Sequence, residues 1–162
     1  MEQFEHHYRR LYRYLDRLTG DPEQAADLAQ ETFVRLYHRG SLPDDTAAWV
    51  ITVAMNLFRN DQSSRSRRMR LLTGARGEQV QGDPSISPMD ATLAEESRRQ
   101  VRAAIDQMPE RERRMLLLRA EGYSYREIAG ALELNEASVG TLLARAQRTF
   151  RQAYEESVNA ER

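Results

Sequence analysis

Residues 108–151 have the spacing of a helix-turn-helix, and this segment constrains the fold more than any other part of the chain. Two short helices that cross at a steep angle need a small residue at their closest approach and apolar residues around it. Ala129 supplies the small residue. The apolar positions at the matching offsets are Ile128, Leu132, Leu134, Val139, Leu142 and Leu143. An ordinary helical hairpin with a Leu/Ala core is the alternative interpretation of this spacing.

The second helix of this motif is predicted to leave one face free to enter a DNA major groove. That face comprises Ala137, Ser138, Gly140, Thr141, Ala144 and Arg145. Arg148 and Arg151 continue the basic character along the same helix. The turn departs from the usual pattern, because Glu133 stands where Gly or Asn is typical. A left-handed φ at this position costs a non-glycine residue about 1 kcal/mol.

Basic and acidic residues are concentrated in different segments of the chain, so no single sign of charge dominates the whole protein. The net charge is −1, but residues 59–70 hold five Arg and one Asp, whereas residues 77–96 hold five acidic residues and no Arg. A chain without a global basic field must bind nucleic acid through local patches. Residues 59–70 are the first candidate for such a patch.

The N-terminal part predicts amphipathic helices. The first ends near Gly20, and Asp21 and Pro22 then provide an N-cap and a first-turn proline for a second helix that runs to about Arg39. The second helix has one apolar stripe. Its opposite face carries charge that a small core does not require: Asp27, Gln30, Glu31 and Arg35.

A third long helix is predicted to follow the loop 40–46, with Thr46 as its cap. Its inward residues are predicted to be Trp49, Val50, Val53 and Leu57. The same helix combines aromatic, amide and guanidinium groups at Trp49, Asn56, Phe58, Arg59 and Asn60. Such groups suit unpaired bases, which stack on aromatic rings and bond to amides and arginine. A core Trp49 beside a solvated arginine run is the alternative.

Residues 73–92 are rich in Gly, Pro, Ser and Asp and poor in hydrophobic residues, which is typical of a linker. The sequence therefore predicts an all-α protein of two small helical domains, an N-terminal helical bundle and a C-terminal helix-turn-helix domain, joined by a flexible acidic linker. The predicted bounds are 1–70 for the first domain, 71–93 for the linker and 94–156 for the second domain.

No catalytic or metal-binding pattern stands out, so we expect neither an enzyme nor a cofactor. The chain has no Cys, and its only histidines are His6, His7 and His38. Adjacent histidines on a helix point about 100° apart and do not make a metal site. The longest apolar runs are too short to span a membrane. A soluble, cytoplasmic protein is the expectation.

The order of these parts resembles the extracytoplasmic-function class of bacterial RNA polymerase sigma factors, in the sigma-70 family. In the first module the resemblance rests on LTGDPEQAADLAQETFVRLY and AAWVITVAMNLFRNDQSSRSRR. In the second module it rests on the segment 108–151. Together these segments cover roughly residues 4–70 and 94–152. The resemblance implies a non-enzymatic subunit that binds core polymerase and directs promoter recognition, −10 melting and transcription initiation.

The resemblance also implies roles for single residues. The face of Asp27, Gln30, Glu31 and Arg35 is similar to the surface that docks on the β′ clamp helices of polymerase. The implied −10 DNA contacts are Leu42, Pro43, Asn56, Arg59 and Asn60. The second module is similar to the domain that holds the β flap tip and recognises the −35 element, with implied contacts at Ser138, Gly140, Thr141, Arg145 and Arg148. An anti-sigma factor is a further implied partner.

Three features depart from the family pattern. The loop 40–46 is short, Asn60 stands where Asp is common, and Gly140 and Leu142 replace positions that often hold Lys or Arg. Fewer charges on the recognition helix predict fewer phosphate contacts. Two other classes of function fit parts of the pattern: a free-standing helix-turn-helix transcriptional regulator, and a helical adaptor that binds only protein.

Overall fold

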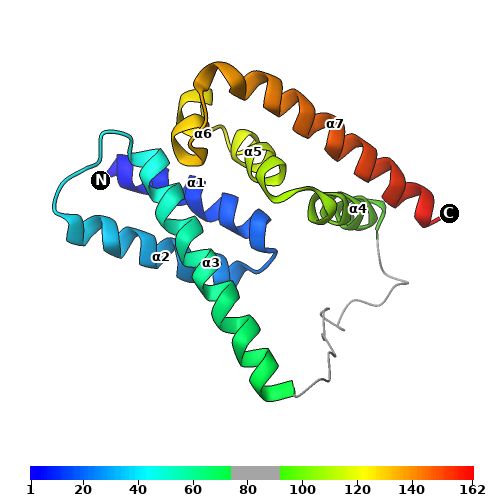
Figure 1. The fold of residues 1–162 in the computed structure, drawn as a ribbon, viewed down its shortest axis with the longest axis horizontal. Coiled ribbons are helices and arrows are strands. Elements are labelled where there is room, and N and C mark those ends of the chain that lie inside the picture. Colours follow the sequence, from blue (N-terminus) through cyan, green and yellow to red (C-terminus); the bar gives the residue numbers. More distant parts are fainter. Residues whose placement is uncertain (74–91) are drawn as a thin grey trace.

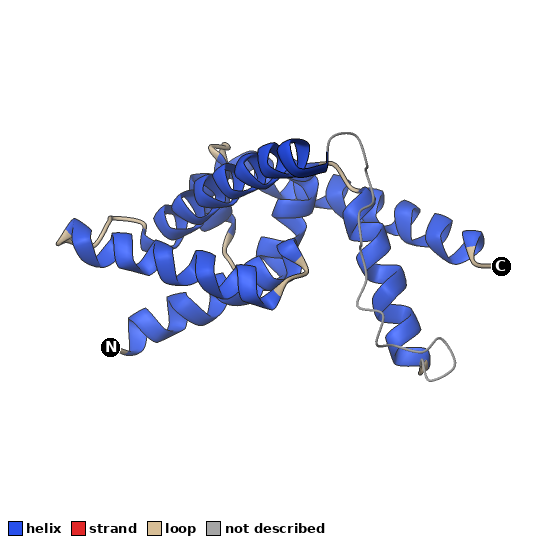
Figure 2. Ribbon diagram, turned by 90° about the horizontal axis from the view of Figure 1, so that it is seen from below, coloured by secondary structure: helices blue, strands red, loops and turns tan. Residues whose placement is uncertain are grey.

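The computed structural model describes residues 1–73 and 92–162, and every regular element in these two ranges is an α-helix (Figure 2). The all-α class predicted from the sequence is confirmed. The helices are α1 (Glu2–Thr19), α2 (Pro22–Arg39), α3 (Thr46–Thr73), α4 (Leu93–Gln107), α5 (Glu110–Ala120), α6 (Tyr125–Leu132) and α7 (Glu136–Ala160).

The capping residues explain why the first helices begin and end where they do. Asp21 accepts hydrogen bonds from the backbone N–H groups of Glu23 and Gln24 at 3.0 and 3.2 Å, as the sequence predicted. Asp45, and not Thr46, caps α3, because its Oδ1 accepts from the Ala48 N–H at 3.0 Å. The Thr46 hydroxyl does not cap the helix, because it donates to the Pro43 carbonyl.

The predicted linker lies largely outside the described residues, which exclude 74–91. Helix α3 continues through Thr73, past the predicted boundary at residue 70. Helix α4 begins at Leu93 with a capping box, in which Thr92 and Glu95 each bond the other's backbone N–H. The domain boundaries drawn from the sequence remain a prediction.

The helices form two groups, α1–α3 and α4–α7, that lie against each other (Figure 1). Helix α7 runs along the top of the molecule in this view, and the second half of α3 extends beyond the bundle at the bottom. Contacts between the groups join α1 to α5 and α3 to α6. The first half of α3 is therefore enclosed by both groups, whereas its basic second half is exposed.

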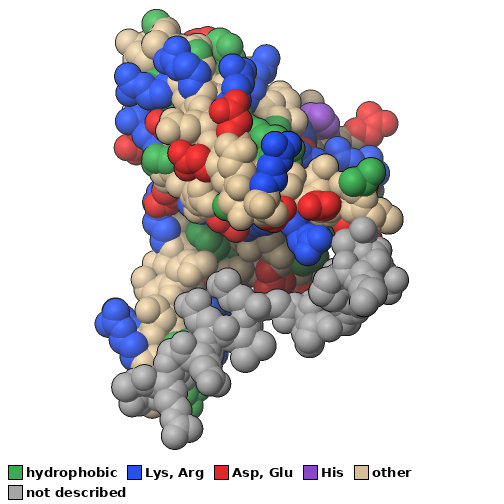
Figure 3. Space-filling view, turned by 90° about the vertical axis from the view of Figure 1, so that its right-hand side faces the viewer, with side chains coloured by type: hydrophobic (Ala, Val, Ile, Leu, Met, Phe, Trp, Pro, Cys, Tyr) green, Lys and Arg blue, Asp and Glu red, His purple; other side chains and the backbone are tan. Residues whose placement is uncertain are grey.

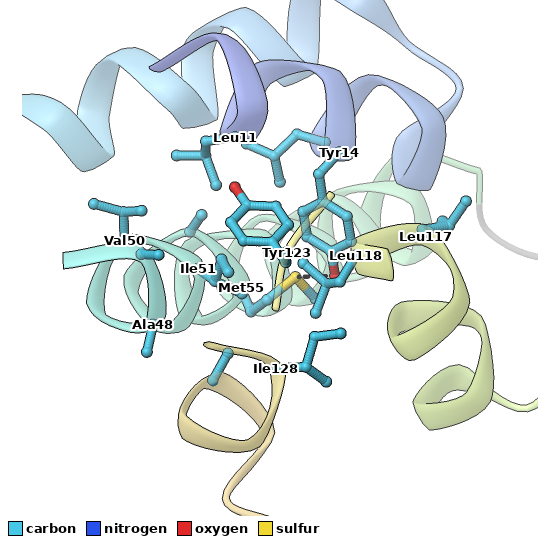
Figure 4. Packing of buried hydrophobic residues seen from close by; sticks show 14 of the residues in the cluster. Leu11, Tyr14, Ala48, Val50, Ile51, Met55, Leu117, Leu118, Tyr123 and Ile128 are labelled. Atoms are coloured by element: carbon cyan, nitrogen blue, oxygen red, sulfur yellow. Dashed lines mark hydrogen bonds between the residues drawn. The ribbon is translucent and has the colours of Figure 1, made fainter. Parts of the chain in front are cut away.

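One hydrophobic core runs through both groups (Figure 4). At its centre Tyr14 of α1 and Tyr123, which precedes α6, are 0% and 1% exposed. The other buried members labelled in Figure 4 are Leu11, Ala48, Val50, Ile51, Met55, Leu117, Leu118 and Ile128. Burying a side chain of this size contributes about 1.5–3 kcal/mol, so the contact between the groups is a substantial part of the fold.

Candidate nucleic-acid and polymerase interfaces

The helix-turn-helix is present as α6, a turn and the start of α7. Ser124 and Glu127 form a capping box at the start of α6, and the Asn135 side chain accepts from the Ala137 N–H at 3.1 Å to start α7. Glu133 adopts the left-handed conformation predicted from the sequence, with φ 55° and ψ 49°. It is the only non-glycine residue with positive φ in the two described ranges.

The start of α7 presents the face expected of a recognition helix. Val139 and Leu143 are buried, which turns Ser138, Thr141 and Arg145 outward into solvent. Arg148 is also exposed, one turn further along α7. The described part of the chain thus offers two hydroxyl and two guanidinium side chains close together along α7 and exposed to solvent.

Gly140 lies elsewhere on this helix. It is half-buried, and a Cβ atom at this position would lie 3.5 Å from Cε2 of the Tyr125 ring. Gly140 therefore faces α6 more than an open groove, although the sequence placed it among the DNA-facing residues. A Cβ atom at this distance would make ordinary van der Waals contact with the tyrosine ring.

Tyr125 and Arg119 are candidate contacts that the sequence interpretation missed. The Tyr125 side chain is 42% exposed, and the Arg119 guanidinium carbon lies 5.2 Å from the centre of its ring. Arg119 also donates to the Tyr123 carbonyl at 3.0 Å. At a helix start beside the recognition helix, Tyr125 offers a hydroxyl and Arg119 a cation to a phosphate backbone. The sequence does not reveal this role, because Tyr125 lies beside Gly140 of the recognition helix only in the folded chain.

The polar face of α2 is exposed as predicted. Asp27, Gln30, Glu31 and Arg35 all lie on the surface, with a 3.2 Å ion pair between Arg35 Nε and Glu31 Oε1. Beneath them, Gln24 is only 6% exposed and donates from Nε2 to Oδ2 of Asp61 at 2.7 Å. This side-chain bond holds the face of α2 against α3.

Five residues were predicted to contact the −10 DNA, and the structure divides them between two places. Asn56 and Arg59 lie together on α3, where Arg59 Nη1 donates to Asn56 Oδ1 at 3.5 Å, and Asn60 follows them on the surface. Leu42 instead lines a small pocket with Phe4, His7 and Phe33. Pro43 is half-buried in the same loop.

Among the described residues, no group of three His, Asp or Glu side chains could hold a metal ion. His7 is partly buried, and this burial, together with His6 and Arg10, lowers its pKa below the ordinary value. No helix in the described part of the chain is long and apolar enough to cross a membrane.

The surface charges are mixed. On the face in Figure 3, arginine and acidic side chains alternate, with arginines more frequent toward the upper edge, the side on which α7 lies in Figure 1. A mixed surface gives little long-range attraction to DNA, so specific contacts must supply the binding.

Comparison with known proteins matches both halves of this arrangement. The model of Sigma-70 region 2 matches residues 3–68, and that of Sigma-70 region 4 matches residues 98–149. Together with the helix-turn-helix, these matches define a two-region member of the Sigma-70 family.

Full-length relatives narrow the class. The chain is 33% identical over 159 residues to the ECF RNA polymerase sigma factor SigL of Mycobacterium tuberculosis, covering 94% of this chain and 87% of SigL. It is 28% identical over 160 residues to SigX of Bacillus subtilis, covering 94% and 81%. The chain belongs to the ECF class of RNA polymerase sigma factors and acts as a sigma factor.

The fold also has a solved counterpart. The sigma factor RpoE in the complex with the anti-sigma factor NepR from Bartonella quintana is similar with a TM-score of 0.67 at 18% sequence identity, covering 95% of each chain. The same arrangement of helices is therefore compatible with very different sequences.

The strained turn of the helix-turn-helix gives a stability prediction. Glu133→Gly should raise the free energy of unfolding by about 0.5–1 kcal/mol, because glycine adopts a left-handed φ without the Cβ penalty. Gln147→Gly, on an exposed and helical part of α7, should lower it by about 1 kcal/mol. Urea unfolding followed by circular dichroism measures both. Equal losses at the two positions would show that Glu133 is not strained.

Proposed function

We propose that this sigma factor docks on core RNA polymerase through the exposed polar face of α2, contacts −10 DNA with α3 and recognises the −35 element with the start of α7. The observation that supports the proposal best is that the start of α7, the second helix of a complete helix-turn-helix, has an exposed polar face. The β′ clamp helices and the β flap are the proposed polymerase partners. The role is non-enzymatic, and its site is the cytoplasm, where polymerase and DNA meet.

Each DNA contact set is small, so the two modules depend on polymerase. Two weak DNA contacts give a higher combined affinity when a scaffold holds both at a fixed spacing, because binding of the first raises the effective concentration of the second. The isolated chain should therefore bind promoter DNA poorly, and a free-standing regulator would bind a duplex operator strongly without polymerase. Mixing the chain with core polymerase and promoter DNA separates these two functions. An anti-sigma factor is a further proposed partner, since the similar RpoE was solved in complex with one.

The polymerase surface is tested by substituting Asp27→Ala and Gln30→Ala together. Both side chains are exposed, so the free energy of unfolding should change by no more than about 0.5 kcal/mol per substitution. The affinity for core polymerase should fall by about tenfold or more, as measured by fluorescence titration. The matched control is Gln152→Ala with Glu155→Ala on α7, also exposed. If the affinity is unchanged, this face lies outside the polymerase interface.

The −10 contact is tested by Asn56→Ala. An amide can bond the edge of an extruded base, and the loss of such a contact set costs about 1–3 kcal/mol. Polymerase binding should persist while promoter opening, measured by permanganate reactivity, is reduced. Gln62→Ala is the control, because Gln62 is an exposed amide on the same helix. Normal opening by the Asn56 variant would assign base recognition to other residues.

The −35 contact is tested by comparing Arg145→Ala with Arg148→Ala. Arg145 should bond a base edge, so its loss should cost about 1–3 kcal/mol and relax the preference at one base pair. Arg148 should face the backbone, so its loss should weaken all sequences alike and flatten the salt dependence. Selection of a randomised −35 library with each holoenzyme measures both effects. Unchanged preference and affinity in both variants would show that α7 is not the recognition helix.

A further inference from the structure

Arg114 of α5 is a buried cation that lacks an acidic partner. The residue is only 7% exposed, and its Nε has no hydrogen-bond partner. In the described part of the chain, no carboxylate lies within ion-pair distance of its guanidinium. Removing an unpaired charge from water is costly, so buried charges in proteins are normally paired. An anion bound beside Arg114 would offset this cost.

The contact between Arg114 and Tyr14 supplies no such negative charge. The charge of Arg114 and its hydrogen bond to the tyrosine oppose the rise in the Tyr14 pKa that burial causes, but the pKa stays raised. The Tyr14 hydroxyl therefore keeps its proton, and it donates that proton to Met55 Sδ at 3.4 Å. A neutral hydroxyl can accept one hydrogen bond from the guanidinium, but it leaves the positive charge uncompensated.

Arg114 forms part of the wall of a cleft of about 240 Å³ where α3 meets α5 and α6. On the α3 side the cleft is lined by Thr52, Asn56 and Arg59, which are all exposed, so the cleft is open to solvent. Its volume lies below the roughly 300–1,000 Å³ of pockets for drug-sized ligands. The cleft therefore suits a small ion better than a nucleotide or a strand of DNA.

The side chains around the cleft favour an oxyanion. The guanidinium groups of Arg114 and Arg59 and the Asn56 amide are hydrogen-bond donors, whereas Glu133 contributes the one carboxylate of the lining. Glu110 Oε1 lies 3.9 Å from Arg59 Nη2, but both side chains are more than half exposed, so this pair is weak. Guanidinium groups donate two parallel hydrogen bonds to the oxygens of a phosphate, an arrangement that a spherical chloride ion cannot match.

We propose that this cleft is a binding site for a free oxyanion of the phosphate class, in which Arg114 compensates the negative charge and Arg59 and Asn56 are further donors. The site is a property of the free chain and does not rest on the proposed promoter contacts. Its walls come from α3 and from α5 and α6, so a bound anion contacts both helix groups. A ligand that binds only the folded chain stabilises it by mass action, and phosphate should therefore raise the Tm.

The first test compares the unaltered full chain with Arg114→Met, which keeps a long side chain and removes the charge. At constant ionic strength, inorganic phosphate should raise the Tm of the unaltered chain to a plateau, whereas chloride should not. The phosphate Kd, measured by the broadening of the phosphorus NMR line, should be at least about tenfold weaker in Arg114→Met. Arg111→Met, at an exposed position on the same helix, is the matched control and should bind phosphate like the unaltered chain.

Binding is distinguished from a general salt effect of phosphate, because an ion that is merely excluded from the surface stabilises every variant alike and reaches no plateau. An equal rise in Tm without a plateau in the unaltered chain and in Arg114→Met overturns the proposal. The proposal is also wrong if Arg114→Met leaves the phosphate Kd unchanged and weakens binding of a single-stranded −10 oligonucleotide, because Arg114 would then be a DNA contact.

A second variant tests the site through a gain of affinity, which a loss of folding cannot produce. Glu133→Gln removes the carboxylate from the cleft and keeps the length of the side chain, so the phosphate affinity should rise by about threefold or more. Glu155→Gln, at an exposed position of α7 outside the cleft, is the matched control and should leave the phosphate Kd unchanged. Equal phosphate affinity in Glu133→Gln and the unaltered chain would show that the anion does not bind in this cleft.

Discussion

The burial of Tyr14 and Tyr123 between the two helix groups is the interaction on which the rest of the arrangement depends. Tyr14 is fully buried, and its hydroxyl donates to Met55 Sδ at 3.4 Å across from α1 to α3. Burial raises the pKa of both tyrosines, so both rings stay neutral in the core. Because these two aromatic rings fill the space between the groups, α5 and α6 lie against the proposed −10 helix and not apart from it.

The features that the sequence predicted correctly are those determined within a few residues. Asp21 caps α2 because its side chain needs only the next two N–H groups. Glu133 is left-handed because the chain must reverse between two helices whose apolar offsets are fixed. The exposed face of α2 follows from helical periodicity alone. In each case the partner group is a neighbour along the chain, so a local pattern was sufficient.

The features that the sequence did not reveal depend on partners far along the chain. Tyr14 lies on the same face of α1 as Leu11 and Leu18, but its hydroxyl needs Met55, 41 residues away on α3, as its hydrogen-bond acceptor. Gln24 is buried because Asp61, 37 residues away, accepts its amide hydrogen. Gly140 faces Tyr125, which no helical pattern connects to it. The prediction of a flexible linker led to an expectation of two separate domains. The hydrophobic core that both helix groups share could not be inferred from the apolar periodicity of either group alone.

The mixed charge of the surface connects the packing of the two helix groups to the proposed sigma function. With a net charge of −1, the chain has no field that would draw it to DNA unaided. Several of its arginines are instead paired with its own carboxylates between the groups, as Arg10 is with Glu127 and Arg17 with Glu121. Each of these pairs has at least one largely buried partner, and the cost of removing that charge from water offsets much of the attraction, so the pairs orient the contact more than they strengthen it. Apolar burial provides the affinity between the modules, and the ion pairs select the one orientation in which Asn56 and Arg59 face α6.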